Sequence, residues 1–191
     1  MIDLEPATIR MAHLLTSISD AQLERPTPCP DTSLGDLVDH VSALTIGFSA
    51  VARKAGDLSG SPPRPNAANL EPDWRDRIAR DLDVLAQAWR DAGAWQGTTM
   101  AAGVPLPGEI AGLVALDELV VHGWDIAVST GQTYAPSLTE IEAAASFVTS
   151  FDAPRDGSLF GPIVPVADNA TPLDRLLGLT GRDPAWQPPT E

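Results

Sequence analysis

A net charge of −14, from 26 acidic and 12 basic side chains in 191 residues, argues against a protein that binds nucleic acid or anionic lipid. The single cysteine, Cys29, excludes an intramolecular disulfide. The length suits one domain over residues 1–191 whose core folds without help, so a metal site would serve function before structure.

The N-terminus reads Met-Ile-Asp-Leu-Glu, without the charged and apolar stretches of a secretion signal. No uninterrupted apolar run reaches the roughly 18 residues of a membrane helix. We therefore expect a cytoplasmic protein without a membrane partner.

Residues 4–18 carry apolar side chains at helical spacing, which predicts a first helix with one buried stripe. His13 falls on the polar side of this helix. We expect a solvated histidine there, without a functional role.

A proline-rich loop precedes the next helix. Residues 24–31 hold three prolines in five positions, which favours an extended segment. Ser33 followed by Asp36 resembles a capping box and predicts the start of a helix that continues to about Lys54.

His40 lies on the apolar face of that helix, with Leu37 and Leu44 one turn to either side. A lone histidine in such a place is normally a hydrogen-bonded core residue. The interpretation changes because Glu118 and His122 occupy a similarly apolar helix, and three inward-facing ligands suit a metal ion.

A long Pro/Gly/Ser/Asn-rich connection covers residues 56–72, and its length permits a crossover between helices that are not antiparallel neighbours. A third helix follows and ends near Gly93, with Trp74 and Trp89 expected in the core. Residues 98–100 and 104–106 are expected to pair as a small hairpin.

The next helix is expected from about Glu109 to Thr130, before Gly131. Glu118 and His122 are four residues apart on it, so their side chains leave the same face. A buried carboxylate needs a positive partner, and a metal ion is one such partner.

Other residues of this helix have expected roles around the pair. Ala111 and Ala115 lie on the same face and suggest where a ligand enters. Asp125 either accepts a hydrogen bond from the His122 imidazole or is a solvated carboxylate. Gly123, unfavourable inside a helix, indicates close packing or access to the site.

Two more helices are expected towards the C-terminus. Ser137 with Glu140 caps one, whose apolar side includes Phe151, and Thr171 with Asp174 caps a short last one. The bundle core would cover about residues 3–151, with an extension over 152–191. The apolar segment 160–166 either lines a pocket or covers core surface.

Two imidazoles and one carboxylate form a ligand set for zinc or another divalent transition ion, with a coordination position left open. Bound water or thiol would lose a proton easily at that position. The usual zinc motifs, His-Glu-x-x-His or paired Cys-x-x-Cys, are absent from the sequence.

Other catalytic patterns find little support. Cys29 lies between two prolines, and nothing in the sequence indicates a lowered thiol pKa, so we do not expect a cysteine nucleophile. A Gly-x-Ser-x-Gly elbow for a Ser-His-Asp triad is also absent.

Four segments resemble a known family: Thr27–Asp31, Gly35–His40, Leu116–Ala127 and Pro172–Pro184. They are similar to actinobacterial proteins of the DinB-like superfamily, and more narrowly to proteins with the metal-binding domain of mycothiol-dependent maleylpyruvate isomerase. The resemblance extends over nearly the whole chain.

This resemblance implies an all-α fold, a four-helix bundle of up-down-down-up connectivity. It implies a divalent metal, usually zinc, held by His40, Glu118 and His122. It also implies a low-molecular-weight thiol such as mycothiol, which the isomerase adds to a double bond that then rotates.

The sequence departs from the family at two points. Thr32 stands where tryptophan is frequent, which would reshape the pocket entrance. The isomerase has a separate C-terminal domain, whereas only the short extension 152–191 follows Phe151 here, so we do not expect maleylpyruvate to be the substrate.

Our leading hypothesis is a metal- and thiol-dependent transferase or isomerase that acts on a small electrophile. A metal-dependent hydrolase that uses bound water, with Asp125 as general base, and a non-catalytic binding or regulatory module are the alternatives. The sequence leaves a homodimer open.

Overall fold

The computed structural model describes residues 1–55, 64–150, 155 and 160–189. These ranges are mainly α-helical, which confirms the all-α fold class. The α-helices are α1 (Glu5–Thr16), α2 (Leu34–Ala52), α3 (Trp74–Arg90), α4 (Gly108–Thr130), α5 (Leu138–Ser150) and α6 (Pro172–Leu179). The shorter elements are the 3-10 turns η1 (Asp20–Gln22), η2 (Ala67–Asn69) and η3 (Ala92–Trp95) and the strands β1 (Thr98–Ala101) and β2 (Val104–Pro107).

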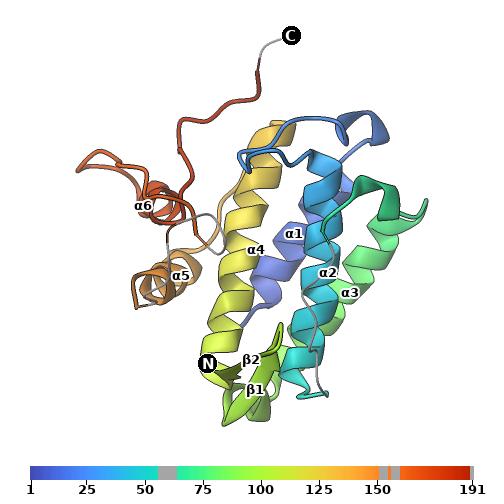
Figure 1. The fold of residues 1–191 in the computed structure, drawn as a ribbon, viewed down its shortest axis with the longest axis vertical. Helices are drawn as coiled ribbons and strands as arrows, with labels where there is room; N and C mark the ends of the chain where they lie inside the picture. The colour runs from blue at the N-terminus through green and yellow to red at the C-terminus, as the bar shows by residue number, and fades with distance from the viewer. Residues whose placement is uncertain (56–63, 151–154, 156–159, 190–191) are drawn as a thin grey trace.

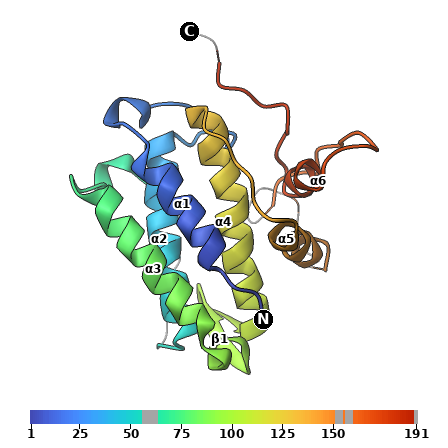
Figure 2. The same ribbon diagram turned by 180° about the vertical axis from the view of Figure 1, so that it is seen from behind.

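Helices α1 to α4 form a four-helix bundle (Figure 1, Figure 2). In Figure 1, α1 and α4 run upward whereas α2 and α3 run downward, which is the expected up-down-down-up connectivity. Helices α1 and α2 each pack against both α3 and α4. Helices α2 and α3 run in the same direction, so they are not antiparallel neighbours, which agrees with the crossover that the length of residues 56–72 permits. Residues 56–63 of that connection lie outside the described residues.

The ends of the helices follow local signals. At the start of α2, the Ser33 hydroxyl accepts the Asp36 backbone N–H at 3.2 Å, and the Asp36 carboxylate accepts the Ser33 backbone N–H at 3.2 Å, as the capping box predicted. At the end of α4, Gly131 adopts a left-handed conformation with a φ of 73°. Helix α1 ends before the predicted Ile18, because the chain leaves the helix at Ser17.

The small hairpin expected before α4 is present. Strands β1 and β2 pair antiparallel, with Thr98 opposite Pro107 and Ala101 opposite Val104. The two residues of the turn, Ala102 and Gly103, have φ values of 49° and 77°, the left-handed values that this kind of tight hairpin turn requires. The hairpin lies at the end of the bundle where α4 begins (Figure 1).

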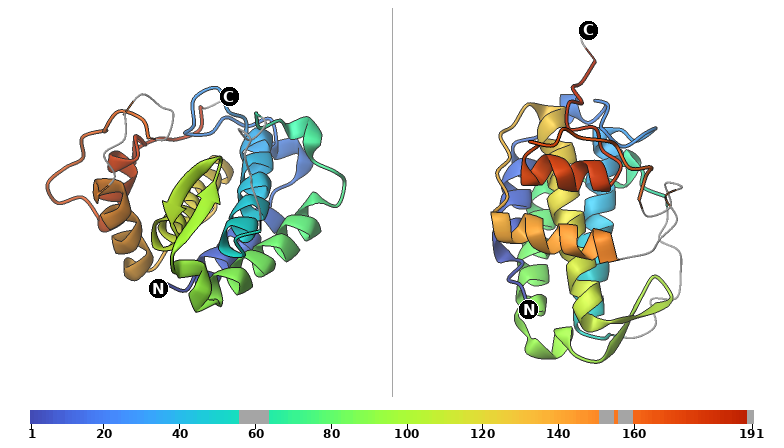
Figure 3. Two further views of the ribbon diagram at one scale, coloured as in Figure 1. Left: turned by 60° about the horizontal axis from the view of Figure 1, so that its bottom comes forward. Right: turned by 90° about the vertical axis from the view of Figure 1, so that its left-hand side faces the viewer.

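Helices α5 and α6 lie on the side of α4 that faces away from the other bundle helices (Figure 3). Helix α5 packs on α4, and α6 packs on α5. The predicted caps are present at both: Ser137 with Glu140 before α5, and Thr171 with Asp174 at α6. Phe151, at the predicted end of the bundle core, lies outside the described residues.

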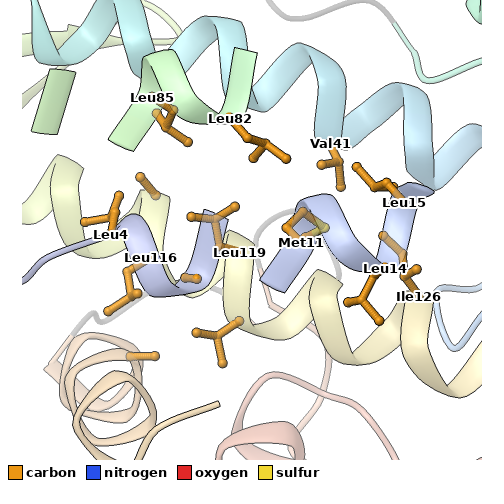
Figure 4. Packing of buried hydrophobic residues seen from close by; sticks show 14 of the residues in the cluster. Leu4, Met11, Leu14, Leu15, Val41, Leu82, Leu85, Leu116, Leu119 and Ile126 are labelled. Atoms are coloured by element: carbon orange, nitrogen blue, oxygen red, sulfur yellow. The ribbon is translucent and has the colours of Figure 1, made fainter. Parts of the chain in front are cut away.

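The bundle core is a continuous cluster of apolar side chains from α1 to α4, of which Figure 4 shows aliphatic members. Trp74 and Trp89 belong to it, with 2% and 1% of their surface exposed, as predicted. His13 is exposed, also as predicted. Helix α4 is buried on nearly all sides because the bundle covers one face and α5 covers the other.

By length and composition alone, helix α2 could cross a membrane. The search of the sequence for an uninterrupted apolar run did not detect it, because polar residues interrupt the helix. Half of its apolar window is buried inside the protein. A core helix of a globular bundle has the same composition, and α2 packs on α3 and α4 as such a helix does.

Candidate metal centre

Three side chains meet between α2 and α4: His40, Glu118 and His122, which we call the ligand triad. The His122 Nε2 atom is 3.0 Å from Glu118 Oε2, and His40 Nε2 is 3.9 Å from the same oxygen. The two imidazole rings stand nearly perpendicular, with centroids 5.0 Å apart. The structure brings together the three residues that the sequence singled out, and their binding of a metal stays a prediction.

The packing of α2 on α4 sets the direction of these side chains. Leu37 and Val41, on either side of His40 in the helix, are 1% and 2% exposed and fix the rotation of α2. On α4, Leu119 and Val120 are buried in the same core cluster. The two helices therefore cannot rotate without exposing apolar surface, and the three polar side chains keep a common direction.

Asp125 holds the second nitrogen of His122. Its Oδ2 atom lies 2.9 Å from His122 Nδ1, and the Asp125 side chain is fully buried. An ionised carboxylate can only accept, so Nδ1 carries the proton and Nε2 is left to face Glu118. Of the two roles considered for Asp125, the hydrogen-bond acceptor is the one found.

Two residues from irregular segments complete the surroundings of this carboxylate. Arg182, just after α6, donates from Nη2 to Asp125 Oδ2 at 3.2 Å. The Cys29 thiol, in the loop before α2, is 3.3 Å from the same oxygen. Arg182 Nη2 is also 3.5 Å from Cys29 Sγ. We call Cys29, Asp125 and Arg182 the supporting cluster.

Burial and ion pairing together set the pKa values. Burial alone would raise the pKa of Asp125, but the His122 hydrogen bond and the Arg182 charge lower it below its ordinary value. Burial alone would lower the pKa of His122, but hydrogen bonds, led by the one with Asp125, raise it well above its ordinary value. Burial, followed by the charge of His122, lowers the pKa of His40. His122 thus carries positive charge at the place where a bound cation would replace a proton.

His122 belongs to two sets of donor atoms that lie within 4.8 Å of one another: the ligand triad, and Cys29 with His122 and Asp125. Arg182 decides between them, because its guanidinium already supplies a positive charge beside Asp125 and would repel a cation there. Zinc bonds of about 2.1 Å in a tetrahedral site place ligand atoms about 3.4 Å apart. The two nitrogen-to-oxygen distances in the triad, 3.0 and 3.9 Å, bracket this spacing, and all three ligand atoms lie within 4.8 Å of one another, so the residues present suit a divalent ion.

The ligand triad opens into a cavity of about 620 Å³, a size that suits a small molecule. Its walls come from α4, from single residues of α2 and α5, and from three irregular segments: the loop before α2, the chain after α5 and the turn after α6. Its lining residues are Pro28, Cys29, Pro30, Thr32, His40, Val114, Asp117, Glu118, Val121, His122, Phe147, Phe160, Gly161, Pro162, Thr180, Gly181 and Arg182.

The suggestion that Ala111 and Ala115 mark the entry of a ligand is wrong. These alanines are 0% and 2% exposed and belong to the bundle core. Ala115 shares its surroundings with Met11 of α1 and Leu85 of α3. The cavity lies instead on the α5 side of α4, because the other helices fill the opposite side.

The start of the segment 160–166 has both of the roles that the sequence left open, whereas Ile163 further along is 54% exposed. Phe160 is 3% exposed and packs edge-on against Phe147, with ring centroids 6.1 Å apart. Phe160, Gly161 and Pro162 also form part of the cavity wall. Phe160 therefore packs on the core through its contact with Phe147 and forms part of the cavity wall at the same time.

Asp117 is a cavity residue that sequence reasoning missed. Its side chain is buried, with 6% of the residue exposed, and its Oδ1 atom has no hydrogen-bond partner among the described residues. Burial, and after it the charge of Glu118, raises the pKa of Asp117 to about 8. One signal was present in the sequence: an acidic residue between Val114 and Val121 at helical spacing.

Arg182 was also missed as a residue of the site. It stood in the segment Pro172–Pro184, which carried part of the family resemblance, but no periodicity linked it to Asp125. The two residues are 57 positions apart, and the turn after α6 brings them into contact.

The sequence is similar to known proteins over most of its length. The family model of the mycothiol maleylpyruvate isomerase N-terminal domain matches residues 4–127. Two uncharacterized proteins of Mycobacterium tuberculosis, from strains CDC 1551 / Oshkosh and H37Rv, are each 29% identical over 178 residues, which cover 90% of this chain and 91% of theirs.

Two crystal structures share the fold. The mycothiol-dependent maleylpyruvate isomerase matches with a TM-score of 0.56 at 19% identity, and a histidine-to-alanine mutant of it with 0.58 at 18%. Each match covers 75% of this chain, and this chain spans 63% of the length of those isomerase chains. Because the family model covers more than half of the sequence, the chain belongs to the mycothiol maleylpyruvate isomerase N-terminal domain family.

Proposed function

We propose that the ligand triad holds a divalent transition metal such as zinc, and that the adjoining cavity binds a low-molecular-weight thiol such as mycothiol with a small electrophile. The observation that carries this proposal is a three-ligand set that faces a cavity of about 620 Å³. Membership of a family named for a mycothiol isomerase supports the thiol. The activity would be transfer, isomerisation or detoxification of the electrophile.

A metal on three protein ligands supplies Lewis acidity, which lowers the pKa of a thiol or water at an open coordination position. The chain prepares its own side of the site. Asp125 accepts a hydrogen bond from Nδ1–H of His122, and Nε2 of the same ring is directed towards Glu118. Arg182 keeps Asp125 ionised, which secures that proton position.

The cavity walls suit a reaction that must be shielded from water. Val114 and Val121 of α4 form one apolar wall, and Phe160 with Pro162 contributes to the other. A sulfur atom bound beside the triad would contact these apolar side chains, and its electrostatic interactions with the triad would be stronger than in bulk water.

The isomerisation of maleylpyruvate itself has weaker support than the thiol, because this chain spans 63% of the length of the isomerase chains it matches. The hydrolase alternative needs a free general base. Asp125, the residue first considered for it, is fully buried and engaged with both His122 and Arg182. A non-catalytic binding or regulatory module is the alternative that the experiment below separates.

The proposal includes a cytoplasmic location and small molecules as the partners, with neither nucleic acid nor membrane among them. The net charge of −14 supports the absence of nucleic acid and anionic membrane among the partners, since it repels polyanions. The formation of a homodimer is left open.

Metal analysis of the purified protein tests the metal. We expect about one zinc-like ion per chain, falling to near none in His40→Ala and Glu118→Ala, whereas His13→Ala, which alters an exposed histidine, keeps the ion. Equal metal content in all four proteins would reject the triad as the site.

Thiol binding is tested on the cobalt-substituted protein. Addition of a thiol should produce thiolate charge-transfer absorption in the wild type and none in His40→Ala. A metal-loaded wild type whose spectrum does not change would reject the thiol. Turnover of electrophiles and esters with and without thiol then separates a thiol-dependent enzyme, a hydrolase and a binding module.

A further inference from the structure

We infer that Arg182 is a positioning residue of the metal centre: it holds the Asp125 carboxylate in the orientation that fixes the His122 ring. The C-terminal extension, which carries Arg182, thereby sets the geometry and the affinity of a site whose three ligands all lie on bundle helices. This inference rests on the proposed function, because it takes the ligand triad as the place where a divalent metal binds.

The first argument is the convergence of several groups on one oxygen atom of Asp125. Its Oδ2 atom lies 2.9 Å from His122 Nδ1 and 3.2 Å from Arg182 Nη2, and the side chain is fully buried. The terminal torsion of an aspartate side chain has broad minima, so the hydrogen bond with His122 alone would leave the carboxylate free to turn. The second hydrogen bond, from Arg182, removes this freedom and keeps Oδ2 opposite the imidazole.

The second argument is that the guanidinium group is itself fixed. Its Nη1 atom donates to the Thr180 carbonyl at 3.0 Å, and Nη2 lies 3.5 Å from Cys29 Sγ in addition to its contact with Asp125. Only 16% of the Arg182 side chain is exposed. A planar guanidinium with both terminal nitrogens engaged has a defined plane, which the ammonium group of a lysine lacks. Arg182 thus supplies a direction as well as a charge.

The third argument is that the packing of the extension determines where Arg182 lies. Leu176 and Leu177 of α6 are both 0% exposed, and the backbone N–H of Arg182 donates to the Leu177 carbonyl at 2.8 Å. Gly181 has a φ of 87°, and a Cβ atom there would lie 2.7 Å from Gly161 Cα. The turn after α6 is therefore held between buried helix residues and a second segment of the extension, so the guanidinium has one place to reach.

Charge alone would give Arg182 the opposite effect on metal binding. A guanidinium near the ligand triad repels a divalent ion, so the removal of its charge would strengthen metal binding. Loss of positioning weakens metal binding, because the groups that orient a metal-binding histidine typically contribute roughly 10–100-fold to the affinity. The sign of the change therefore separates the two roles.

The experiment measures the zinc affinity of Arg182→Ala by competition with a chromogenic chelator. We expect an affinity about tenfold weaker than that of the wild type. Arg182→Lys, which keeps the charge without the planar group, should also bind zinc more weakly than the wild type. Arg175→Ala, which removes an exposed arginine of α6, should keep the wild-type affinity. An affinity of Arg182→Ala equal to or above that of the wild type would overturn the inference.

Chemical rescue distinguishes positioning from a general loss of the fold. Arg182 lines the cavity, so a small cation can reach the space that the alanine leaves. Methylguanidinium should restore the zinc affinity of Arg182→Ala, whereas methylammonium, which has the same charge and no planar group, should restore less. Equal rescue by both cations would assign the effect to charge, and rescue by neither would assign it to the fold; either result would overturn the inference.

Cobalt absorption supplies a readout that a merely structural role would not change. The d–d bands of a bound cobalt ion depend on the geometry of its ligands. In fully loaded Arg182→Ala these bands should differ from those of the wild type, and methylguanidinium should return them to the wild-type positions. Identical bands in the two proteins would show that Arg182 does not set the geometry of the site.

The outcomes also separate this inference from the proposed function. A wild-type protein that binds neither zinc nor cobalt contradicts the proposed function and this inference together. A wild-type protein that binds one ion, with the same affinity and the same cobalt bands as Arg182→Ala, contradicts this inference alone and supports the ligand triad as the metal site.

Discussion

The two groups of residues that meet at His122 are built in different ways. The ligand triad comes from two long helices, α2 and α4, whose packing already fixes its side chains. The supporting cluster joins α4 to a loop before α2 and to the turn after α6. Regular secondary structure therefore holds the three candidate metal ligands. The positive charge that balances the buried Asp125 carboxylate comes instead from Arg182 of the C-terminal extension.

The largest expected effect comes from breaking the charge pair of the supporting cluster. Arg182→Met should lower the free energy of unfolding by roughly 3–5 kcal/mol, because it removes the guanidinium from the buried Asp125 carboxylate and leaves it only the His122 imidazole and the Cys29 thiol. Urea unfolding measures this change. Arg175→Met, which alters an exposed arginine of α6, is the control. An equal decrease in the free energy of unfolding in both variants would show that the Arg182–Asp125 pair contributes no more than a surface arginine.

The next effect links the two groups. Asp125→Asn keeps all three residues of the ligand triad but removes the negative charge that fixes the His122 proton. We expect a metal affinity 10–100-fold weaker than that of the wild type. Competition with a chromogenic zinc chelator measures it, and an unchanged affinity would mean that the supporting cluster does not act on the triad.

A substitution at Gly181 tests the packing of the C-terminal extension independently of the packing of the bundle. Gly181 has a φ of 87°, and a Cβ atom there would lie 2.7 Å from Gly161 Cα. Gly181→Ala should therefore lower the free energy of unfolding by more than about 1 kcal/mol.

Gly47 on α2 provides the matched control, because a Cβ atom there would meet nothing within 4 Å. Gly47→Ala should raise the stability by about 1 kcal/mol or less, since alanine favours a helix. Thermal unfolding measures the change in stability of each variant. We expect a decrease for Gly181→Ala and an increase for Gly47→Ala, and a change in the same direction in both would contradict the crowding at Gly181.

The smallest expected effect is on the stability of α2, one of the two helices that carry the ligand triad, and concerns the capping box at its start. The hydrogen bond from the Ser33 side chain lowers the pKa of Asp36 below its ordinary value. A lowered folded-state pKa contributes stability above the unfolded-state pKa, and this contribution disappears as the pH falls through the folded-state pKa. Asp36→Asn should thus cost about 1 kcal/mol at neutral pH and nothing in strong acid. Urea unfolding against pH measures the difference, and a cost independent of pH would contradict it.

Much of the bundle could be predicted because its signals are local. The capping pairs Ser33 with Asp36 and Thr171 with Asp174 mark helix starts, and Gly131 marks an end. Helical spacing alone places Glu118 and His122 on one face. The connectivity came from the family resemblance together with the length of the segment over residues 56–72.

The sequence by itself determined that His40 lies on the apolar face of α2 and that Glu118 and His122 leave one face of α4, because helical spacing fixes which side chains share a face. Only the tertiary structure decided which face of α4 lines the cavity, since α4 is apolar on nearly all sides and the buried Ala115 packs in the bundle core. Only the tertiary structure joined Arg182 to Asp125 and left Asp117 Oδ1 without a hydrogen bond from any residue that the structure describes. These contacts depend on where distant segments pack, and no local pattern carries that information.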